Sequence, residues 1–224
     1  MKWLQDYQLV LLDFDGLLVN TEAIHLAAYE RMCAHRGFHL DWNLNAFYEK
    51  AHLEASGLKE AIYREFPDLF AQEPNWEILY AEKKKNYKEL LKSGLVQLMP
   101  GVEKLLRELA RLKIKRCVVT NSTKEEIQII KEMLVPLYSI PYWITREHYS
   151  RPKPDAECYL KALSLLAAQK DRVIGFEDSL KGLQALEAAK VKGVLICSPD
   201  HPQLKKGSFF HFPSFEVYTG SSSN

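Results

Sequence analysis

The sequence predicts an α/β protein: a doubly wound, Rossmann-like core with a parallel sheet, into which a helical cap domain is inserted. The first observation is that short apolar runs rich in β-branched residues alternate with helical patterns over the second half of the chain. Such runs are typical of parallel strands that are buried on both faces. The second observation is that residues 21 to 92 carry helical periodicity without a convincing strand. Together they indicate one sheet whose sequence is interrupted by a helical insertion.

Each strand is expected where a short apolar run is bounded by polar or turn-forming residues. In chain order these runs are 9–14, 115–120, 142–145, 172–176 and 191–197. Each helix is expected where apolar residues recur every three or four positions, as between Thr21, a typical helix start, and Gly37, a typical stop. In chain order the helices are expected at 21–36, 44–54, 58–66, 75–92, 102–112, 124–134, 156–168 and 179–190.

The insertion divides the chain into two domains. Residues 1–18 and 99–224 are expected to form the α/β catalytic core, and residues 19–98 the helical cap domain. Because the cap leaves the core directly after the first strand, we expect it to sit above the end of the sheet. The last six residues, TGSSSN, are expected to be disordered.

Composition and charge argue against several classes of partner. The chain has 224 residues, of which 47% are hydrophobic, and this is enough for a well-packed core. The 30 basic residues against 29 acidic ones leave a net charge of +1, without the basic bias typical of nucleic-acid or membrane-surface binding. The run EKKK at 82–85 is predicted to be a solvated helix face. We expect no nucleic-acid partner and no membrane association.

Cysteine usage and the N-terminus indicate the compartment. The four cysteines are scattered without a CxxC pair, which fits neither a zinc site nor a disulfide framework. They are Cys33, Cys117, Cys158 and Cys197. Free thiols are typical of a reducing compartment. The N-terminus is a poor signal peptide, and no segment approaches the roughly 18 apolar residues of a membrane span. We expect a cytoplasmic protein, and we expect a monomer.

The first apolar run ends on two carboxylates, in the stretch LVLLDFDG. Asp13 and Asp15 repel each other and gain nothing from apolar neighbours, so the pair is either an exposed turn or part of a cation site. Ligands of open α/β sheets bind beyond the carboxyl ends of the strands, where the first run places Asp13. The residues at the ends of the other strands therefore help to decide between an exposed turn and a cation site.

Polar groups stand after the later strands as well. Thr120, Asn121 and Ser122 follow the second strand, and Lys153 follows the third. Glu177 and Asp178 follow the fourth. Carboxylates suit Mg²⁺, which binds through few carboxylates together with a substrate phosphate. A lysine, hydroxyl groups and helix N-termini suit the phosphate itself. A bound cation would also offset the repulsion between the two aspartates. The set predicts a Mg²⁺-dependent site for a small phosphorylated molecule.

The motifs resemble those of the haloacid dehalogenase superfamily, in the helical-cap branch that includes β-phosphoglucomutase-like and phosphoglycolate-phosphatase-like enzymes. The resemblance covers nearly the whole chain, because DFDGLLVNTE, VVTNST, KPDAECY and GFEDSLKG appear in the family's order. It implies a phosphoric monoester hydrolase in which Asp13 is the nucleophile that forms an aspartyl-phosphate. Asp15 would then protonate the leaving oxygen and later activate water.

The same resemblance implies the other roles. Thr120 and Lys153 are the further catalytic residues that it implies. The metal would contact Asp13, the backbone carbonyl of Asp15 and Asp178, and Glu177 completes the acidic pair that holds it. The substrate-binding residues that we expect are Gly16, Asn121, Ser122 and His25, the last on the first cap helix, where relatives often have a histidine.

Two departures from the family pattern stand out. Asn20 replaces the usual aspartate before Thr21 and Glu22, which leaves the hydrogen bonding of the cap hinge open. The third motif reads KPDAECY where KPxPDxY is common, and the tyrosine spacing favours Lys153 over Arg151 as the family's lysine.

The expected function is a Mg²⁺-dependent phosphatase that hydrolyses a sugar phosphate or a phosphoglycolate-like metabolite. The alternative is a β-phosphoglucomutase-like phosphomutase, which would return the phosphoryl group from Asp13 to a second hydroxyl group of the substrate. Lys83 and Lys84 resemble a basic patch of such mutases, although a solvated face is the preferred interpretation of this run. A catalytically inactive phosphate-binding module is the third hypothesis, and it is disfavoured because every catalytic position is filled.

Overall fold

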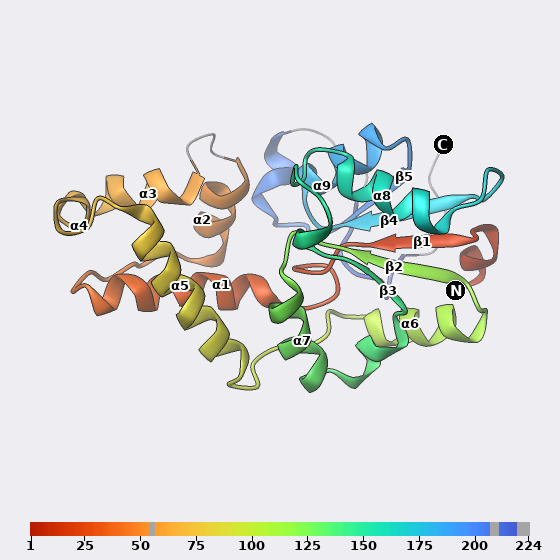
Figure 1. Cartoon of the computed structure of the whole chain (residues 1–224), viewed down its shortest axis with the longest axis horizontal. Coiled ribbons are helices and arrows are strands. Elements are labelled where there is room, and N and C mark those ends of the chain that lie inside the picture. Colours follow the sequence, from red (N-terminus) through yellow and green to blue (C-terminus); the bar gives the residue numbers. More distant parts are fainter. Residues whose placement is uncertain (54–56, 207–210, 219–224) are drawn as a thin grey trace. The chain divides into compact units, whose positions relative to one another are not determined.

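A computed structural model of the chain describes residues 1–53, 57–206 and 211–218 (Figure 1). Its α/β core is a parallel sheet of six strands in the order β3-β2-β1-β4-β5-β6. The strands are β1 (Leu9–Leu12), β2 (Lys115–Val119), β3 (Tyr142–Ile144), β4 (Val173–Glu177), β5 (Lys192–Ile196) and β6 (His211–Phe212). The prediction of a parallel sheet interrupted by a helical insertion is confirmed. The short strand β6 was not expected, because two residues are too few to show a periodic pattern.

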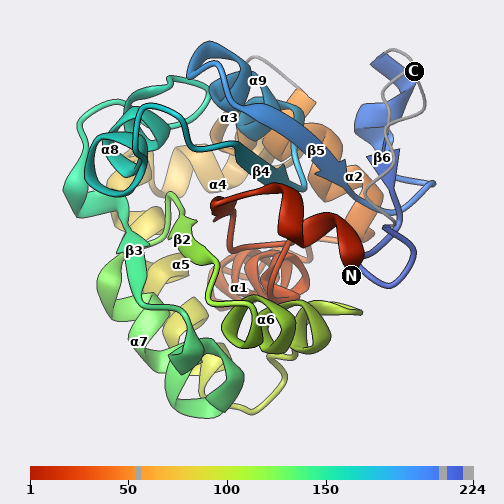
Figure 2. The same ribbon diagram turned by 90° about the vertical axis from the view of Figure 1, so that its right-hand side faces the viewer.

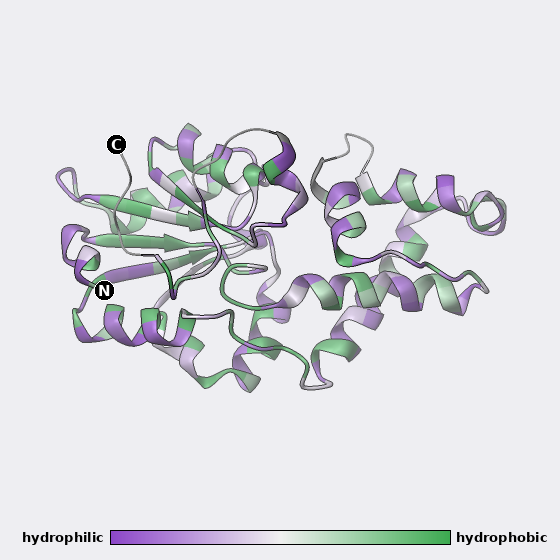
Figure 3. Ribbon diagram, turned by 180° about the vertical axis from the view of Figure 1, so that it is seen from behind, coloured by the Kyte–Doolittle hydropathy of each residue, from purple (hydrophilic) through white to green (hydrophobic). Residues whose placement is uncertain are grey.

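The sheet is covered on both faces, as the continuously apolar strands predict. Every residue of β1 is fully buried, and Figure 3 shows this central strand as hydrophobic, whereas β2 begins with hydrophilic residues. Helices α6 and α7 lie on one face, and α8 and α9 on the other (Figures 1 and 2). Their bounds are α6 (Val102–Arg111), α7 (Lys124–Met133), α8 (Glu157–Leu166) and α9 (Leu180–Ala188). The core also has three short helical turns, η1 (Lys2–Asp6) before β1 and, between later elements, η3 (Val135–Ser139) and η4 (Arg146–His148).

The inserted region is helical throughout its described regular elements. It comprises α1 (Thr21–His35), α2 (Leu44–Tyr48), the π-helical turn η2 (Glu49–Leu53), α3 (Gly57–Glu65), α4 (Pro67–Gln72) and α5 (Trp76–Leu91). Helices α1 and α5 pack side by side (Figure 1), and apolar residues such as Met32, Ile62 and Leu79 form a core of their own. Helix α4 was not expected, because it starts at Pro67, directly after the predicted end of the preceding helix.

The chain forms two compact units. One comprises Met1–Asn20, Gln97–Pro199 and Ser208–Asn224, and the other Thr21–Val96 and Asp200–Gly207. We call the first unit the core and the second the cap. The turn η5 (Pro202–Lys206) therefore belongs to the cap, where Lys205 forms an ion pair with Glu49. The expected disorder of residues 219–224 falls outside the described residues.

The two segments that lead out of the core and back into it are hydrogen-bonded to each other. The backbone N–H of Asn20 donates to the carbonyl of Gln97 at 3.1 Å, and the N–H of Gln97 donates to Asn20 Oδ1 at 2.7 Å. The N–H of Met99 donates to the carbonyl of Leu18 at 2.9 Å. The amide of Asn20, which replaces the aspartate usual in the family, thus still supplies an acceptor oxygen at this position.

The prediction of a solvated face for the run 82–85 is wrong for Lys83. This residue is only 4% exposed, and its ammonium group lies 5.0 Å from the ring centre of Tyr29 and 4.7 Å from that of Tyr87. Aromatic faces attract a cation strongly when water is excluded, so these rings offset part of the cost of burying the charge. The sequence pattern missed this because a lysine on a helix is far more often exposed.

Among the described residues, no helix combines the length and the apolar character that a membrane crossing needs.

The four cysteines give the first testable prediction. All four are buried, and burial raises the pKa of Cys33 and of Cys117 to about 12. Because only the thiolate reacts, we expect iodoacetamide at pH 8 to label the native protein at least about 100-fold more slowly than the chain unfolded in guanidinium chloride. Mass spectrometry of the adducts measures this, and rapid labelling of Cys33 or Cys117 in the native protein would contradict the burial described here.

Candidate active site

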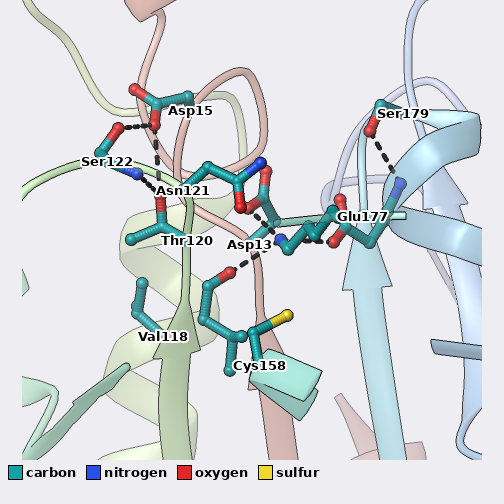
Figure 4. A network of polar contacts seen from close by, with 12 residues as sticks. Asp13, Asp15, Val118, Thr120, Asn121, Ser122, Cys158, Glu177 and Ser179 are labelled. Atoms are coloured by element: carbon teal, nitrogen blue, oxygen red, sulfur yellow. Dashed lines mark hydrogen bonds and ion pairs between the residues drawn. The ribbon is translucent and has the colours of Figure 1, made fainter. Parts of the chain in front are cut away.

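The candidate site lies in the core, at the carboxyl ends of three neighbouring strands. In the register of the sheet, Leu12 of β1 lies opposite Val118 of β2 and Phe176 of β4. The residues just beyond these positions therefore meet at one edge, as is usual for ligand sites of open parallel sheets. They include Asp13 after β1, Thr120 after β2 and Glu177 at the end of β4 (Figure 4).

A buried lysine links all three of these strands. The Nζ atom of Lys153 lies 2.6 Å from Asp13 Oδ1 and 2.6 Å from Glu177 Oε1, and it donates to the carbonyl of Val119 at 2.8 Å. Its side chain is 6% exposed. Burial lowers the pKa of Lys153, but the charges of Asp13 and Glu177 outweigh burial and hold this pKa well above its usual value. The lysine is therefore charged, and its three N–H groups have acceptors.

Glu177 is the most deeply buried carboxylate of the site. It has no exposed surface, and its Oε1 atom also accepts a hydrogen bond from the hydroxyl group of Tyr159. Its Oε2 atom is buried without a hydrogen-bond partner among the described residues. Burial, followed by the charge of Asp13, raises the pKa of Glu177 to about 7, against the opposing effect of Lys153 and Tyr159. The raised pKa thus reflects first the exclusion of water from Glu177 and then the neighbouring charge of Asp13.

Space for this carboxylate depends on a glycine in the next helix. A Cβ atom at Gly182 would lie 2.0 Å from the Glu177 carboxylate. Helix α9 is capped one residue before its start by Ser179, whose hydroxyl accepts a hydrogen bond from the N–H of Gly182 at 3.2 Å (Figure 4). The cap fixes the first turn of α9 and brings its glycine against Glu177.

The acidic side chains are arranged as metal ligands would be. Oxygen atoms of Asp13, Glu177 and Asp178 lie within 4.8 Å of one another. Gly16, which has a left-handed φ of 74°, approaches so closely that a Cβ atom there would lie 2.0 Å from Asp178 Oδ2. Three clustered carboxylates, two of them ion-paired with Lys153, and one buried oxygen that accepts no hydrogen bond from the described residues fit a hard divalent cation.

Asp15 is held by the loop that leaves β2. Its Oδ2 atom accepts hydrogen bonds from the hydroxyl of Thr120, at 3.3 Å, and from the hydroxyl of Ser122. The backbone N–H of Ser122 donates to the Thr120 hydroxyl at 2.9 Å (Figure 4). The second aspartate of the motif therefore lies beside hydroxyl groups rather than beside Lys153, which is a different environment from that of Asp13.

Two tyrosines support the site, and the sequence analysis assigned a role to neither. The hydroxyl of Tyr149 lies 2.8 Å from the carbonyl of Thr120 and 2.6 Å from Asn121 Oδ1. Tyr159 is the tyrosine of KPDAECY and was used only to fix the register of that motif. Tyr159 lies in the first turn of a helix that covers the sheet. That position could have indicated a contact with the groups around Lys153. Tyr149 lies outside the family's motifs, and no sequence signal identified it.

The remaining expected residue, His25, belongs to the cap. It lies on α1, with its Nδ1 atom 2.7 Å from the Nζ atom of Lys83, and its ring stacks on Tyr87 at 4.0 Å between centres. A substrate role for His25 stays a prediction.

Known proteins share the sequence pattern and the fold of this chain. A sequence profile described as haloacid dehalogenase-like hydrolase matches residues 10–196. The chain is 27% identical over 194 residues to Protein CbbY of Rhodobacter capsulatus, with 83% of each protein covered. It is 26% identical over 191 residues to Phosphorylated carbohydrates phosphatase of Thermotoga maritima, with 83% of this chain and 82% of that protein covered.

Solved structures show the same fold. CbbY from Rhodobacter sphaeroides in complex with phosphate has a TM-score of 0.73 and 22% identity, over 94% of this chain and 96% of that one. A mutant of that protein in complex with Xylulose-(1,5)bisphosphate gives the same values.

The fit between Gly182 and Glu177 gives a prediction with an unusual sign. Inside a helix, alanine is ordinarily about 1 kcal/mol more favourable than glycine. Here the added methyl group must displace a carboxylate that is ion-paired in the interior. We therefore expect Gly182→Ala to lower the free energy of unfolding by about 2 kcal/mol or more, measured by urea denaturation.

Gly193→Ala is the matched control for this variant. Its Cβ atom would lie 2.5 Å from the flexible end of Leu183 and in ordinary contact with Leu186, so we expect a smaller loss of about 1 kcal/mol. A Gly182→Ala protein as stable as the wild type would show that Glu177 is not held as described.

Proposed function

The chain belongs to the haloacid dehalogenase-like hydrolase family, and on this premise we propose that it is a Mg²⁺-dependent phosphatase of a small phosphorylated carbohydrate or related metabolite. The observation that carries the proposal is the pairing of two carboxylates with different surroundings. Asp13 is ion-paired with Lys153, and Asp15 accepts hydrogen bonds from hydroxyl groups. Phosphoryl transfer through a carboxylate needs such a pair, one group to attack and the other to move a proton.

In the first step the Asp13 carboxylate attacks phosphorus. A bond forms between its oxygen and phosphorus, the bond from phosphorus to the ester oxygen breaks, and Asp15 gives its proton to the leaving alcohol. The ammonium group of Lys153, 2.6 Å from Asp13, offsets the negative charge that gathers around the transferring group. Thr120, Asn121 and Ser122, directly after β2, would bind the phosphoryl oxygens.

In the second step water replaces Asp13 on phosphorus. Asp15, now a carboxylate, takes a proton from the water as its oxygen bonds to phosphorus, and the bond to Asp13 breaks. Inorganic phosphate leaves and both aspartates return to their initial state. Asp13 is thus the nucleophile and Asp15 the acid and base in this proposal.

Divalent metal has a suitable position within this group. Asp13, Glu177 and Asp178 would hold it, together with the backbone carbonyl of Asp15, and Mg²⁺ is the ion that such oxygen ligands favour beside a phosphate. When bound, it supplies positive charge to the phosphoryl oxygens.

The substrate class draws support from the relatives. The Thermotoga maritima relative is named for phosphorylated carbohydrates, and a mutant of the Rhodobacter sphaeroides structural neighbour is in complex with a sugar bisphosphate. These relatives favour a phosphorylated carbohydrate, and the hydroxyl groups and the lysine of the site suit its phosphate group.

Loss of the nucleophile tests the reaction. We expect the wild type to release free phosphate from at least one member of a panel of sugar phosphates, phosphoglycolate and nucleotides. We expect Asp13→Asn to lower this rate by about 1,000-fold or more, because an amide neither attacks phosphorus nor forms the acyl phosphate. Asp68→Asn, at an exposed position of α4, is the control for a charge change without an effect.

Two other outcomes would count against the proposal. Appreciable phosphate release by Asp13→Asn would exclude Asp13 as the nucleophile. Isomerisation of one sugar phosphate without phosphate release would make the enzyme a mutase.

Removal of the metal tests the cation site separately. We expect EDTA to abolish phosphate release and Mg²⁺ to restore it. Because a ligand that binds only the folded state stabilises it, Mg²⁺ should raise the melting temperature of the wild type. Asp178→Asn should lose most of this increase. Full activity in EDTA, or equal stabilisation of both proteins by Mg²⁺, would contradict a metal at these carboxylates.

A further inference from the structure

One oxygen atom of Glu177 accepts hydrogen bonds from two donors. Glu177 Oε1 accepts a hydrogen bond from Lys153 Nζ at 2.6 Å and another from the Tyr159 hydroxyl. Glu177 and Tyr159 have no exposed surface, and the lysine ammonium lies 5.0 Å from the centre of the tyrosine ring. Tyr159 therefore contacts both members of the buried ion pair.

The rotation of the carboxylate decides what Lys153 can reach. A carboxylate with a single donor can turn about its Cγ–Cδ bond and offer either oxygen, whereas two donors on one oxygen fix its plane. In the observed orientation, Lys153 contacts Asp13 and Glu177 at equal distances of 2.6 Å. The other oxygen, Oε2, keeps its lone pairs free of hydrogen bonds among the described residues.

We propose that Tyr159 is a positioning residue of this site: its hydroxyl group orients the Glu177 carboxylate so that Lys153 stays on Asp13 and Oε2 stays available to a divalent cation. The inference rests on the proposed function, since it concerns the groups that would serve the phosphoryl transfer. Tyr159 itself touches neither the reacting atoms nor the metal in this scheme. It acts through Glu177.

Packing alone does not require the hydroxyl group. The ring of Tyr159 belongs to the apolar cluster between the sheet and helices α8 and α9, and phenylalanine would keep those contacts. A buried hydroxyl group needs an acceptor, and here the acceptor is the carboxylate that also binds the catalytic lysine. Outer partners of this kind commonly alter metal affinity or activity by about 10- to 100-fold when they are removed.

The test is Tyr159→Phe, compared with Tyr218→Phe. Tyr218 is a buried tyrosine of the core that packs on Trp3 and Phe212. The first measurement is titration calorimetry with Mg²⁺ alone, in the absence of substrate. We expect Tyr159→Phe to weaken Mg²⁺ binding about 10-fold and Tyr218→Phe to leave it unchanged.

Steady-state kinetics supply the second readout. We expect kcat of Tyr159→Phe to fall about 10-fold while KM stays within about 2-fold, because the transferring group loses charge stabilisation rather than binding contacts. In the Glu177→Gln background, Tyr159→Phe should have little further effect, because both substitutions remove the same interaction.

Several results would overturn the inference. They are Mg²⁺ affinity and kcat equal to those of Tyr218→Phe, effects that add fully to those of Glu177→Gln, or a wild-type protein that binds no Mg²⁺. Failure of the proposed function is a different result, namely no phosphate release by the wild type from any substrate. The calorimetric comparison still decides the role of Tyr159 in that case, because it uses no substrate.

Discussion

The buried ammonium group of Lys153 is the interaction on which the rest of the site depends. It joins Asp13 after β1, Glu177 at the end of β4 and the carbonyl of Val119 in β2. Taking such a charge out of water costs several kcal/mol, and only well-placed acceptors offset that cost. The order β2-β1-β4 and the register of these strands put the three acceptors within reach of one atom. The strand order therefore determines the geometry of the candidate active site.

The two aspartates of the first motif, Asp13 and Asp15, have different hydrogen-bond partners. Asp13 belongs to a cluster of three carboxylates in which Lys153 is ion-paired with two, and the excess of negative charge favours a cation. Asp15 accepts hydrogen bonds from hydroxyl groups of the loop after β2. The hydroxyl of Tyr149 donates to Thr120 and Asn121 of the same loop. Two carboxylates of one short turn thus have surroundings that differ enough for two chemical tasks, as acid and nucleophile pairs require. All of these groups come from the core.

The sequence predicted the architecture because its strands are apolar at nearly every position and their polar ends stand in a recognisable order. It therefore also indicated which residues the structure brings together: Asp13, Lys153 and Glu177. It did not predict helix α4, whose proline start reads as a break, or strand β6, which is too short to have a pattern. Lys83 was mistaken for a surface residue, because Tyr87 lies one turn away on the same helix but the second ring, that of Tyr29, comes from helix α1. Tyr149 and Tyr159 were missed as partners for the same reason: each acts through a contact with a residue distant in the sequence.

The hydrogen bonds between Asn20 and Gln97 have a consequence for how the protein can be altered and how it evolves. They bring the two ends of the insertion to adjacent backbone positions. For the folding of the core, the inserted segment is therefore one long loop whose ends are joined. The entropy cost of closing a loop grows only with the logarithm of its length. A cap of another size or sequence could replace this one at nearly constant cost to the folding of the core. Closing the loop therefore places little restriction on the size of the inserted segment between residues 20 and 97.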